Sequence, residues 1–107
     1  MEQHEERSWE AEVYRLRGVL LLQQPGTPQE EAEACFQQAL DVARRQQAKS
    51  LELRAAMSLA RLWQRQGKHT DAYELLAPVY GWFTEGFDTG DLQEANTLLD
   101  ALSEEGT

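Results

Sequence analysis

The 107-residue sequence contains a single cysteine, Cys35, and few prolines or aromatic residues. One cysteine excludes an intrachain disulfide framework and fits a reducing compartment, so we expect a cytoplasmic protein. No apolar run reaches about 18 residues and the amino terminus is acidic, which predicts neither a membrane-spanning helix nor a targeting peptide. No segment alternates apolar and polar residues as a half-buried strand does. These absences predict an all-α fold.

The sequence also lacks the residue groupings that catalysis and metal binding require. Its two histidines, His4 and His69, are far apart, and neither stands in a cluster of ligands at metal-binding spacing. The acidic run at 30–33 is explained by the preference of a helix amino terminus for carboxylates. No glycine-rich phosphate-binding loop is present. We therefore expect no catalytic residue, no cofactor and no metal, and a protein that is not an enzyme.

The net charge of −9 is concentrated in the carboxyl-terminal third of the chain. All ten lysines and arginines lie between Arg7 and Lys68, and the first 68 residues also hold ten acidic residues; nine more acidic residues follow. A negative potential at that end disfavours binding to nucleic acids and anionic membranes. We expect neither as a partner, and solubility alone also accounts for the charge.

Five amphipathic stretches follow the 3.6-residue period of an α-helix. They are expected near 5–24, 28–47, 50–67, 70–83 and 91–102. Thr27 is predicted to cap the second helix as part of a capping box, and Ser50 to cap the third. Pro78 removes one hydrogen bond inside the fourth helix, so we expect a kink or an early break there.

Two parts of the chain repeat the same pattern 40 residues apart. The matching residues are Ala32, Phe36 and Ala39 in the first copy and Ala72, Leu76 and Val79 in the second. Each triplet follows a helix with a small inward-facing residue, Gly18 or Ala60. Repeats of this length are typical of stacked helical hairpins, which present a binding surface. The sequence predicts one domain, 1–107, with antiparallel hairpins at about 5–48 and 50–83 and a capping helix at 91–102.

The segment LARLWQRQGK at 59–68, followed by DAYELL at 71–76, resembles a tetratricopeptide repeat. In that family a small residue of the first helix packs against an alanine of the second, and Q-G-K forms the turn. Gly18, Ala32 and Phe36 look like an earlier copy with a loop two residues longer, although Arg17 stands where the family has leucine. The resemblance implies a short solenoid that serves protein–protein interaction.

A second resemblance concerns the segment LAPVYGWFTEGFDT at 76–89 together with ELRAAMSLA at 52–60. These segments are similar to the carboxyl-terminal end of bacterial proteins that join a nucleotide-cyclase or ATPase domain to tetratricopeptide repeats. The resemblance implies the end, or a separated fragment, of a bacterial regulatory or signalling protein. Residues of a cyclase or ATPase site are absent from this chain, so only the scaffold would be shared.

The third helix carries the strongest candidate binding site. Arg54, Arg61 and Arg65 fall within about 40° of one another at about 100° per residue, on a helix that is otherwise largely apolar. The first helix of each tetratricopeptide hairpin lines the concave groove, so the resemblance places these arginines there, and Arg15 of the first helix with them. Arginines suit the carboxylates of an acidic protein or peptide partner. The alternatives are a sensor that binds a small acidic metabolite, and a solvated face whose arginines pair with acidic neighbours.

The first helix holds more apolar side chains than one neighbouring helix covers. The stripe expected to face the second helix consists of Trp9, Val13, Leu16 and Leu20. The residues that point elsewhere, and that are predicted to be exposed if no repeat precedes, are Tyr14, Leu21 and Leu22. Because burial of such side chains favours pairing, we expect a two-fold homodimer through the first helices. A monomer whose acidic amino terminus folds over this face is the alternative.

Two smaller features are interpreted as structural. Cys35 is expected to be a buried, unreactive thiol, because no neighbouring cation would lower its pKa. The aromatic residues Trp82, Phe83 and Phe87 are expected to close the end of the core beneath the final helix rather than to form an aromatic pocket.

Overall fold

The computed structural model describes residues 3–83 and 90–105, and the side chains of residues 10–83 and 90–104. The helices are α1 (Gln3–Gln23), α2 (Gln29–Arg45), α3 (Lys49–Arg65), α4 (His69–Trp82) and α5 (Gly90–Glu105). No strand occurs within the two described ranges, which confirms the all-α class. Among the described residues, no helix is long and apolar enough to cross a membrane.

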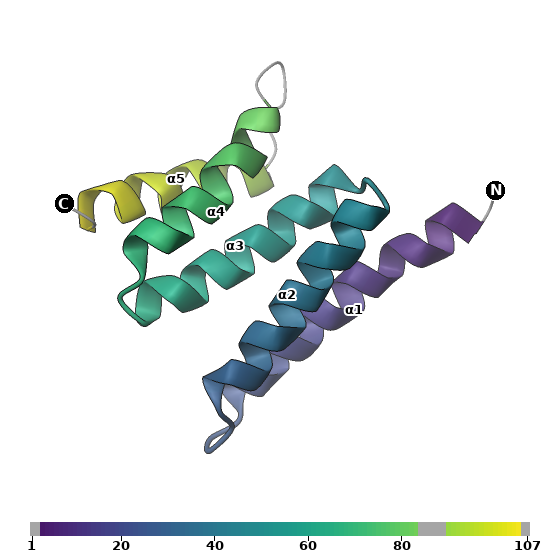
Figure 1. Ribbon diagram of the computed structural model, residues 1–107, viewed down its shortest axis with the longest axis horizontal. Coiled ribbons are helices and arrows are strands. Elements are labelled where there is room, and N and C mark those ends of the chain that lie inside the picture. Colours follow the sequence, from purple (N-terminus) through teal and green to yellow (C-terminus); the bar gives the residue numbers. More distant parts are fainter. Residues whose placement is uncertain (1–2, 84–89, 106–107) are drawn as a thin grey trace.

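The helices form two layers of a short antiparallel stack (Figure 1). One layer consists of α1, α3 and α5, in which α3 contacts both of the others. The second layer consists of α2 and α4, and each of these packs against the helix before it and the helix after it. Within the described residues, no Cα pair closer than 8 Å joins α2 to α4, so α3 is visible between them. The arrangement is two hairpins followed by a single helix, as the repeat predicts.

The two hairpins close through similar turns. Residues 24–28 connect α1 to α2, whereas residues 66–68 connect α3 to α4, so the first loop is two residues longer, as predicted. Each turn contains a glycine in the left-handed region, Gly26 at φ 84° and Gly67 at φ 83°. A side chain is disfavoured there because its Cβ would crowd the backbone. The helices α2 and α4 begin 40 residues apart, at Gln29 and His69.

The predicted amino-terminal caps are wrong at both helices. Thr27 Oγ1 donates to Gln24 Oε1 at 3.4 Å, and the residue before α2 is Pro28, which makes no side-chain capping bond. Ser50 lies inside the first turn of α3, which begins directly after Ala48. Ser50 does not cap α3 because the turn before this helix is tight: Gln47 at φ 56° and the bond from Ala48 N to Ala43 O close α2 directly before α3 begins.

Pro78 does not end α4. The helix continues to Trp82, where Phe83 N donates to Tyr80 O at 3.0 Å. The side chain of Pro78 is exposed, while Leu76 and Val79 on the same helix are buried in the core. Burial of these side chains offsets the one hydrogen bond that proline removes.

The core lies between the two layers and is centred on α3, which contacts all four other helices. The largest fully buried side chains are Phe36, Leu53, Leu59, Leu62, Leu76 and Leu102. The small residues of the repeat let the helices approach. A Cβ atom added at Gly18 would lie 2.6 Å from Cε1 of Phe36, so this ring occupies the space that a side chain would need. Glycine at this position therefore sets the spacing of α1 and α2.

The predicted division of α1 into two faces is wrong. Val13, Leu16 and Leu20 are 54%, 49% and 59% exposed. The residues predicted to be exposed, Tyr14, Leu21 and Leu22, are half-buried and pack against the core instead. The face toward α2 is marked by small residues, Ala11 and Gly18, because only small residues permit close helix packing. Gly18 lies about 200° from Leu16 around the helix, so the larger stripe points away. The side chain of Trp9 lies outside the described residues.

The expectations for the aromatic residues near the end of α4 and for Cys35 are met only in part. Trp82 is exposed: its ring lies edge-on to Phe83, with centroids 5.0 Å apart, and 5.3 Å from Nζ of Lys49. Phe83 packs against the core, and Phe87 lies outside the described residues. Cys35 is half-buried on α2 rather than fully buried.

Candidate functional site

Arg54 lies at the centre of the layer formed by α1, α3 and α5. Its Nη1 donates to Oε2 of Glu12 on α1 at 3.0 Å, and its Nε donates to Oδ2 of Asp91 on α5 at 3.0 Å. Arg15 Nε donates to Oε1 of the same Glu12 at 2.7 Å. Arg54 therefore joins three helices through ion pairs with acidic neighbours. Arg15 also donates through Nη2 to Oε2 of Glu12 at 3.2 Å, so two of the four predicted arginines are held by carboxylates of the chain.

These ion pairs keep their groups charged. The hydrogen bond from Arg15 holds the pKa of Glu12 below its ordinary value; burial opposes this effect, and the hydrogen bond from Arg54 adds to it. The hydrogen bond to Asp91 is the main cause that raises the pKa of Arg54; burial opposes it, and the charge of Asp91 and the hydrogen bond to Glu12 add to the rise. Two carboxylates of this chain already balance the charge of Arg54, so it is a weaker candidate for an external anion although three of its five N–H donors remain.

The other three predicted arginines meet between α1 and α3. Arg15, Arg61 and Arg65 line a cavity of about 250 Å³, which we term the arginine pocket. Arg61 and Arg65 reach it together because residues four apart share one face of a helix. The remaining lining residues are Val19, Leu22 and Gln23 of α1, Phe36 of α2, and Ser58 and Leu62 of α3. The pocket thus combines cationic side chains with an apolar wall.

The charge of the arginine pocket is only partly balanced by the protein. Arg61 Nη2 lies 3.6 Å from Oε1 of Glu94, with 49% and 62% of the two side chains exposed. Exposed pairs of this kind are weak and exchange readily with solvent. Arg65 is exposed and forms no ion pair with another residue in the described part of the chain. Arg15 donates to Glu12 through both Nε and Nη2, so the donors left for an anionic ligand come mainly from Arg61 and Arg65.

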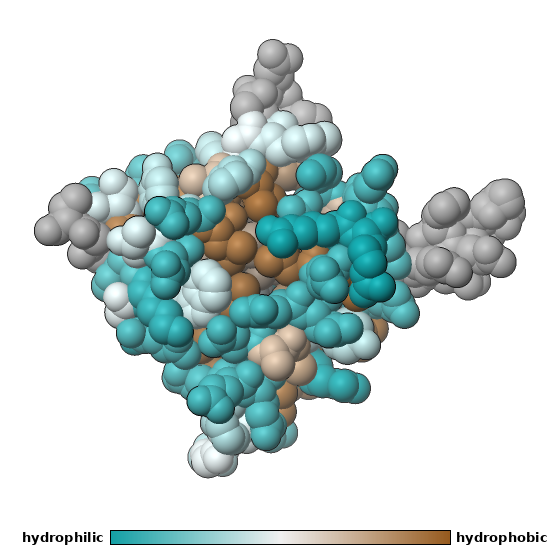
Figure 2. Space-filling view, in the orientation of Figure 1, coloured by the Kyte–Doolittle hydropathy of each residue, from teal (hydrophilic) through white to brown (hydrophobic). Residues whose placement is uncertain are grey.

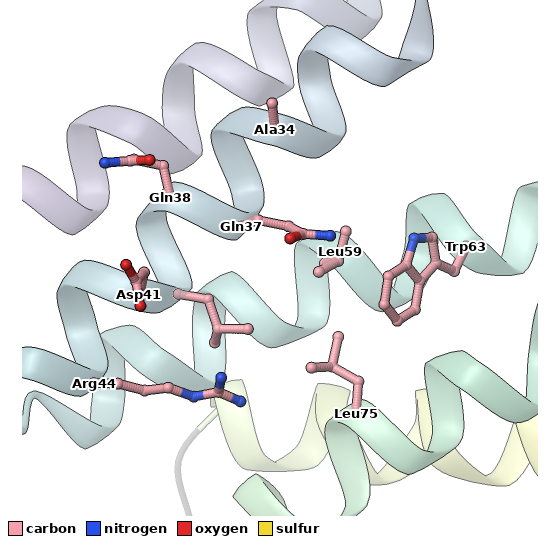
Figure 3. Close-up of a pocket in the computed structure, with 9 residues that line it drawn as sticks. Ala34, Gln37, Gln38, Asp41, Arg44, Leu59, Trp63 and Leu75 are labelled. Carbon is pink, nitrogen blue, oxygen red and sulfur yellow. The ribbon is translucent and has the colours of Figure 1, made fainter.

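A second groove lies on the opposite side of the molecule, between α2 and α4. Figure 2 shows apolar surface there, bordered by hydrophilic side chains. The cavity measures about 520 Å³, and Leu59, Trp63 and Leu75 converge on it, with Asp41 and Arg44 at its edge (Figure 3). Sequence reasoning did not predict this groove, because it exists only where α2 and α4 stay apart. Its mixture of side chains selects no particular ligand chemistry.

Candidate catalytic or metal-binding groups do not gather in the described structure. No group of three or more histidine, cysteine or acidic side chains is placed to hold a metal among these residues. His69 begins α4 and Cys35 lies on α2, and neither lines the arginine pocket. The side chain of His4 lies outside the described residues.

Sequence reasoning missed the two carboxylates that hold Arg54. The pair of Glu12 and Arg15 has the three-residue spacing of a helical ion pair, and that signal was available. Asp91 could not be found in this way, because it stands 37 residues from Arg54 on a separate helix. Comparison of the chain with protein-family models, with curated proteins and with solved structures finds no match. A proposal for the function of this protein therefore rests on the sequence and geometry of the chain itself.

Proposed function

We propose that this chain is a protein-interaction module of the tetratricopeptide type, which binds acidic segments of a partner protein in the arginine pocket. The observation that carries the proposal is the convergence of Arg15, Arg61 and Arg65 on one cavity with apolar walls. A peptide carboxylate would accept charge-assisted hydrogen bonds from the guanidinium groups of Arg61 and Arg65, with the charge of Arg15 beside them. Val19, Leu22 and Leu62 would cover the methylene groups that carry the carboxylate.

The order of the helices supports the same proposal. In a stack of hairpins, the layer formed by the first helices is the surface available to a peptide, and here that layer is α1, α3 and α5. The arginine pocket opens between the first two of these helices. The resemblance of residues 52–60 and 76–89 to bacterial signalling proteins adds a regulatory role to the proposal.

Arginine also favours binding over catalysis. Its guanidinium group stays protonated at physiological pH, so it holds anions but does not exchange protons with a substrate. The serine that lines the arginine pocket, Ser58, has no histidine beside it in the set of lining residues. We therefore assign no catalytic residue and propose binding without chemistry.

The competing ligand is a small acidic metabolite, which would make the chain a sensor. The arginine pocket, at about 250 Å³, lies below the usual range of small-molecule pockets, about 300–1,000 Å³. Its size therefore favours one acidic side chain of a peptide as the ligand. Native mass spectrometry of the purified protein separates the two ligands. An adduct of small-molecule mass that disappears in the Arg61→Gln/Arg65→Gln variant would favour the sensor.

A fluorescent peptide of six glutamates, with a six-glutamine peptide as its control, tests the proposed function. Loss of charge-assisted bonds in Arg61→Gln/Arg65→Gln should weaken binding about tenfold or more, measured by fluorescence anisotropy. The matched variant Arg45→Gln/Lys68→Gln removes two exposed charges elsewhere and should weaken binding less than about threefold. Equal losses in the two variants, at unchanged helicity, would show attraction to net charge alone and contradict the proposed site.

A further inference from the structure

One row of apolar side chains on α1 has no covering element in the described structure. It consists of Val13, Leu16 and Leu20, each about half exposed or more, and we term it the α1 row. The three positions fall within an arc of about 60° on the helix. They lie on the side opposite Ala11 and Gly18, which are buried. The α1 row therefore faces away from the other described helices.

The spacing of the α1 row is that of a paired helix. Steps of three and four residues place Val13, Leu16 and Leu20 at successive a, d and a positions of a heptad, which form the seam of a two-helix coiled coil. A helix that buries only one face would carry polar residues at these positions. Residues 3–9 continue α1 as a helix, so this end of the chain extends along the axis and does not fold over the row (Figure 1).

The charges beside the α1 row of one copy are complementary to those of a second copy. Glu10 and Arg17 are both exposed and lie seven residues apart on the same edge of the row. When two copies of α1 cross antiparallel about a two-fold axis, Glu10 of each copy comes opposite Arg17 of the other. A parallel pair would instead bring Arg17 to Glu12, whose oxygens already accept bonds from Arg15 and Arg54. The charges therefore favour the antiparallel pair.

We propose that a second copy of this chain covers the α1 row, with the two α1 helices antiparallel about a two-fold axis. This interface differs from the one predicted from sequence, because Tyr14, Leu21 and Leu22 already pack within the chain. It also leaves the arginine pocket open, since Arg15, Val19 and Leu22 occupy the adjoining face of α1 toward α3. The dimer would therefore present two open arginine pockets, and its formation does not depend on which ligand they bind.

Light scattering of the full chain over about 1–100 μM tests the proposal. The unaltered protein should approach twice the subunit mass as its concentration rises. Leu16→Glu places a charge in the seam and should give one subunit mass throughout. The control Tyr73→Glu alters an exposed aromatic residue on α4 and should leave the dimer intact. One subunit mass for the unaltered protein at every concentration, or equal loss of the dimer in both variants, overturns the proposal.

A charge exchange tests the antiparallel arrangement. Arg17→Glu places a carboxylate opposite Glu10 of the other copy in both symmetry-related pairs. This repulsion should raise the dissociation constant of the dimer about tenfold or more. Adding Glu10→Arg restores the opposite charges in reversed order and should bring the constant back to within about threefold of the original value. Failure of the second substitution to restore dimerisation, while circular dichroism shows intact helices in both variants, overturns the arrangement.

Discussion

The two hairpins follow the same repeat, but their first helices occupy different surroundings. α3 contacts all four other helices, and eight of its seventeen residues are buried, including the charged Glu52. Among the described helices, α1 contacts α2 and α3 alone, and of its residues 10–23 only Ala11 and Gly18 are buried. Similar apolar patterns thus become core in the middle of a stack and exposed surface at its end. Neighbours decide the outcome as much as the pattern does.

The difference between α1 and α3 should be largest when the same substitution is made in both helices. Leu59→Ala removes a fully buried side chain of α3 and should lower the free energy of unfolding by about 2–5 kcal/mol. Leu20→Ala makes the same truncation in the α1 row and should change it by less than about 0.5 kcal/mol. Urea unfolding below about 1 μM, where the proposed dimer has dissociated, measures both. Similar losses in the two variants would contradict the exposed position of Leu20.

The close approach of α1 to α2 is tested at its glycine. Gly18→Ala should lower the free energy of unfolding by about 1–2 kcal/mol, because the strain against Phe36 exceeds the gain in helix propensity of about 1 kcal/mol. Gly81→Ala is the matched control: no atom lies within 4 Å of its added Cβ, and α4 should gain a few tenths of a kcal/mol. Thermal unfolding compares them, and a stabilised Gly18→Ala variant would refute the tight contact.

The ion pairs of the α1, α3 and α5 layer give a smaller, pH-dependent effect. The pKa of Glu12 is lower in the folded chain than in the unfolded one, so its stabilisation is present above the ordinary carboxyl value and is lost as the pH falls through the folded value. Glu12→Gln should therefore lower the free energy of unfolding by about 1–2 kcal/mol at neutral pH.

That deficit should shrink as the pH falls through the lowered pKa of folded Glu12, and should approach zero once the unaltered Glu12 is protonated in both states. Urea unfolding at several pH values measures it, with Glu31→Gln on the exposed first turn of α2 as the control. A deficit that stays constant from neutral to acid pH would show that Glu12 acts through packing and not through charge.

The fold was largely predictable because helix periodicity is a local signal. Helix number, the hairpin order and the 40-residue offset of α2 and α4 all follow from apolar spacing and from the glycines in the turns. The face of α1 was not predictable from apolar residues, since two stripes compete and only the neighbours choose between them. Gly18 was the better guide, because a glycine inside a helix indicates a close contact.

The candidate site was predictable only in part, for related reasons. Arg61 and Arg65 share a face by spacing alone, and both line the arginine pocket. The bonds of Arg54 to Glu12 and Asp91 depend on how separate helices dock. The missed cap at Ser50 has another cause: a left-handed Gln47 closes α2 where glycine is the usual signal.

The order of the helix contacts has a consequence for how the chain folds. Every contact between described helices joins two that are adjacent or next but one along the sequence. Chains with such local contacts have low contact order and close small loops first, so folding within milliseconds is expected. Stacked units also open from their ends. Amide hydrogens of α3 should therefore exchange slowest, and those of α1 and α5 should exchange through fraying that leaves the middle of the stack intact.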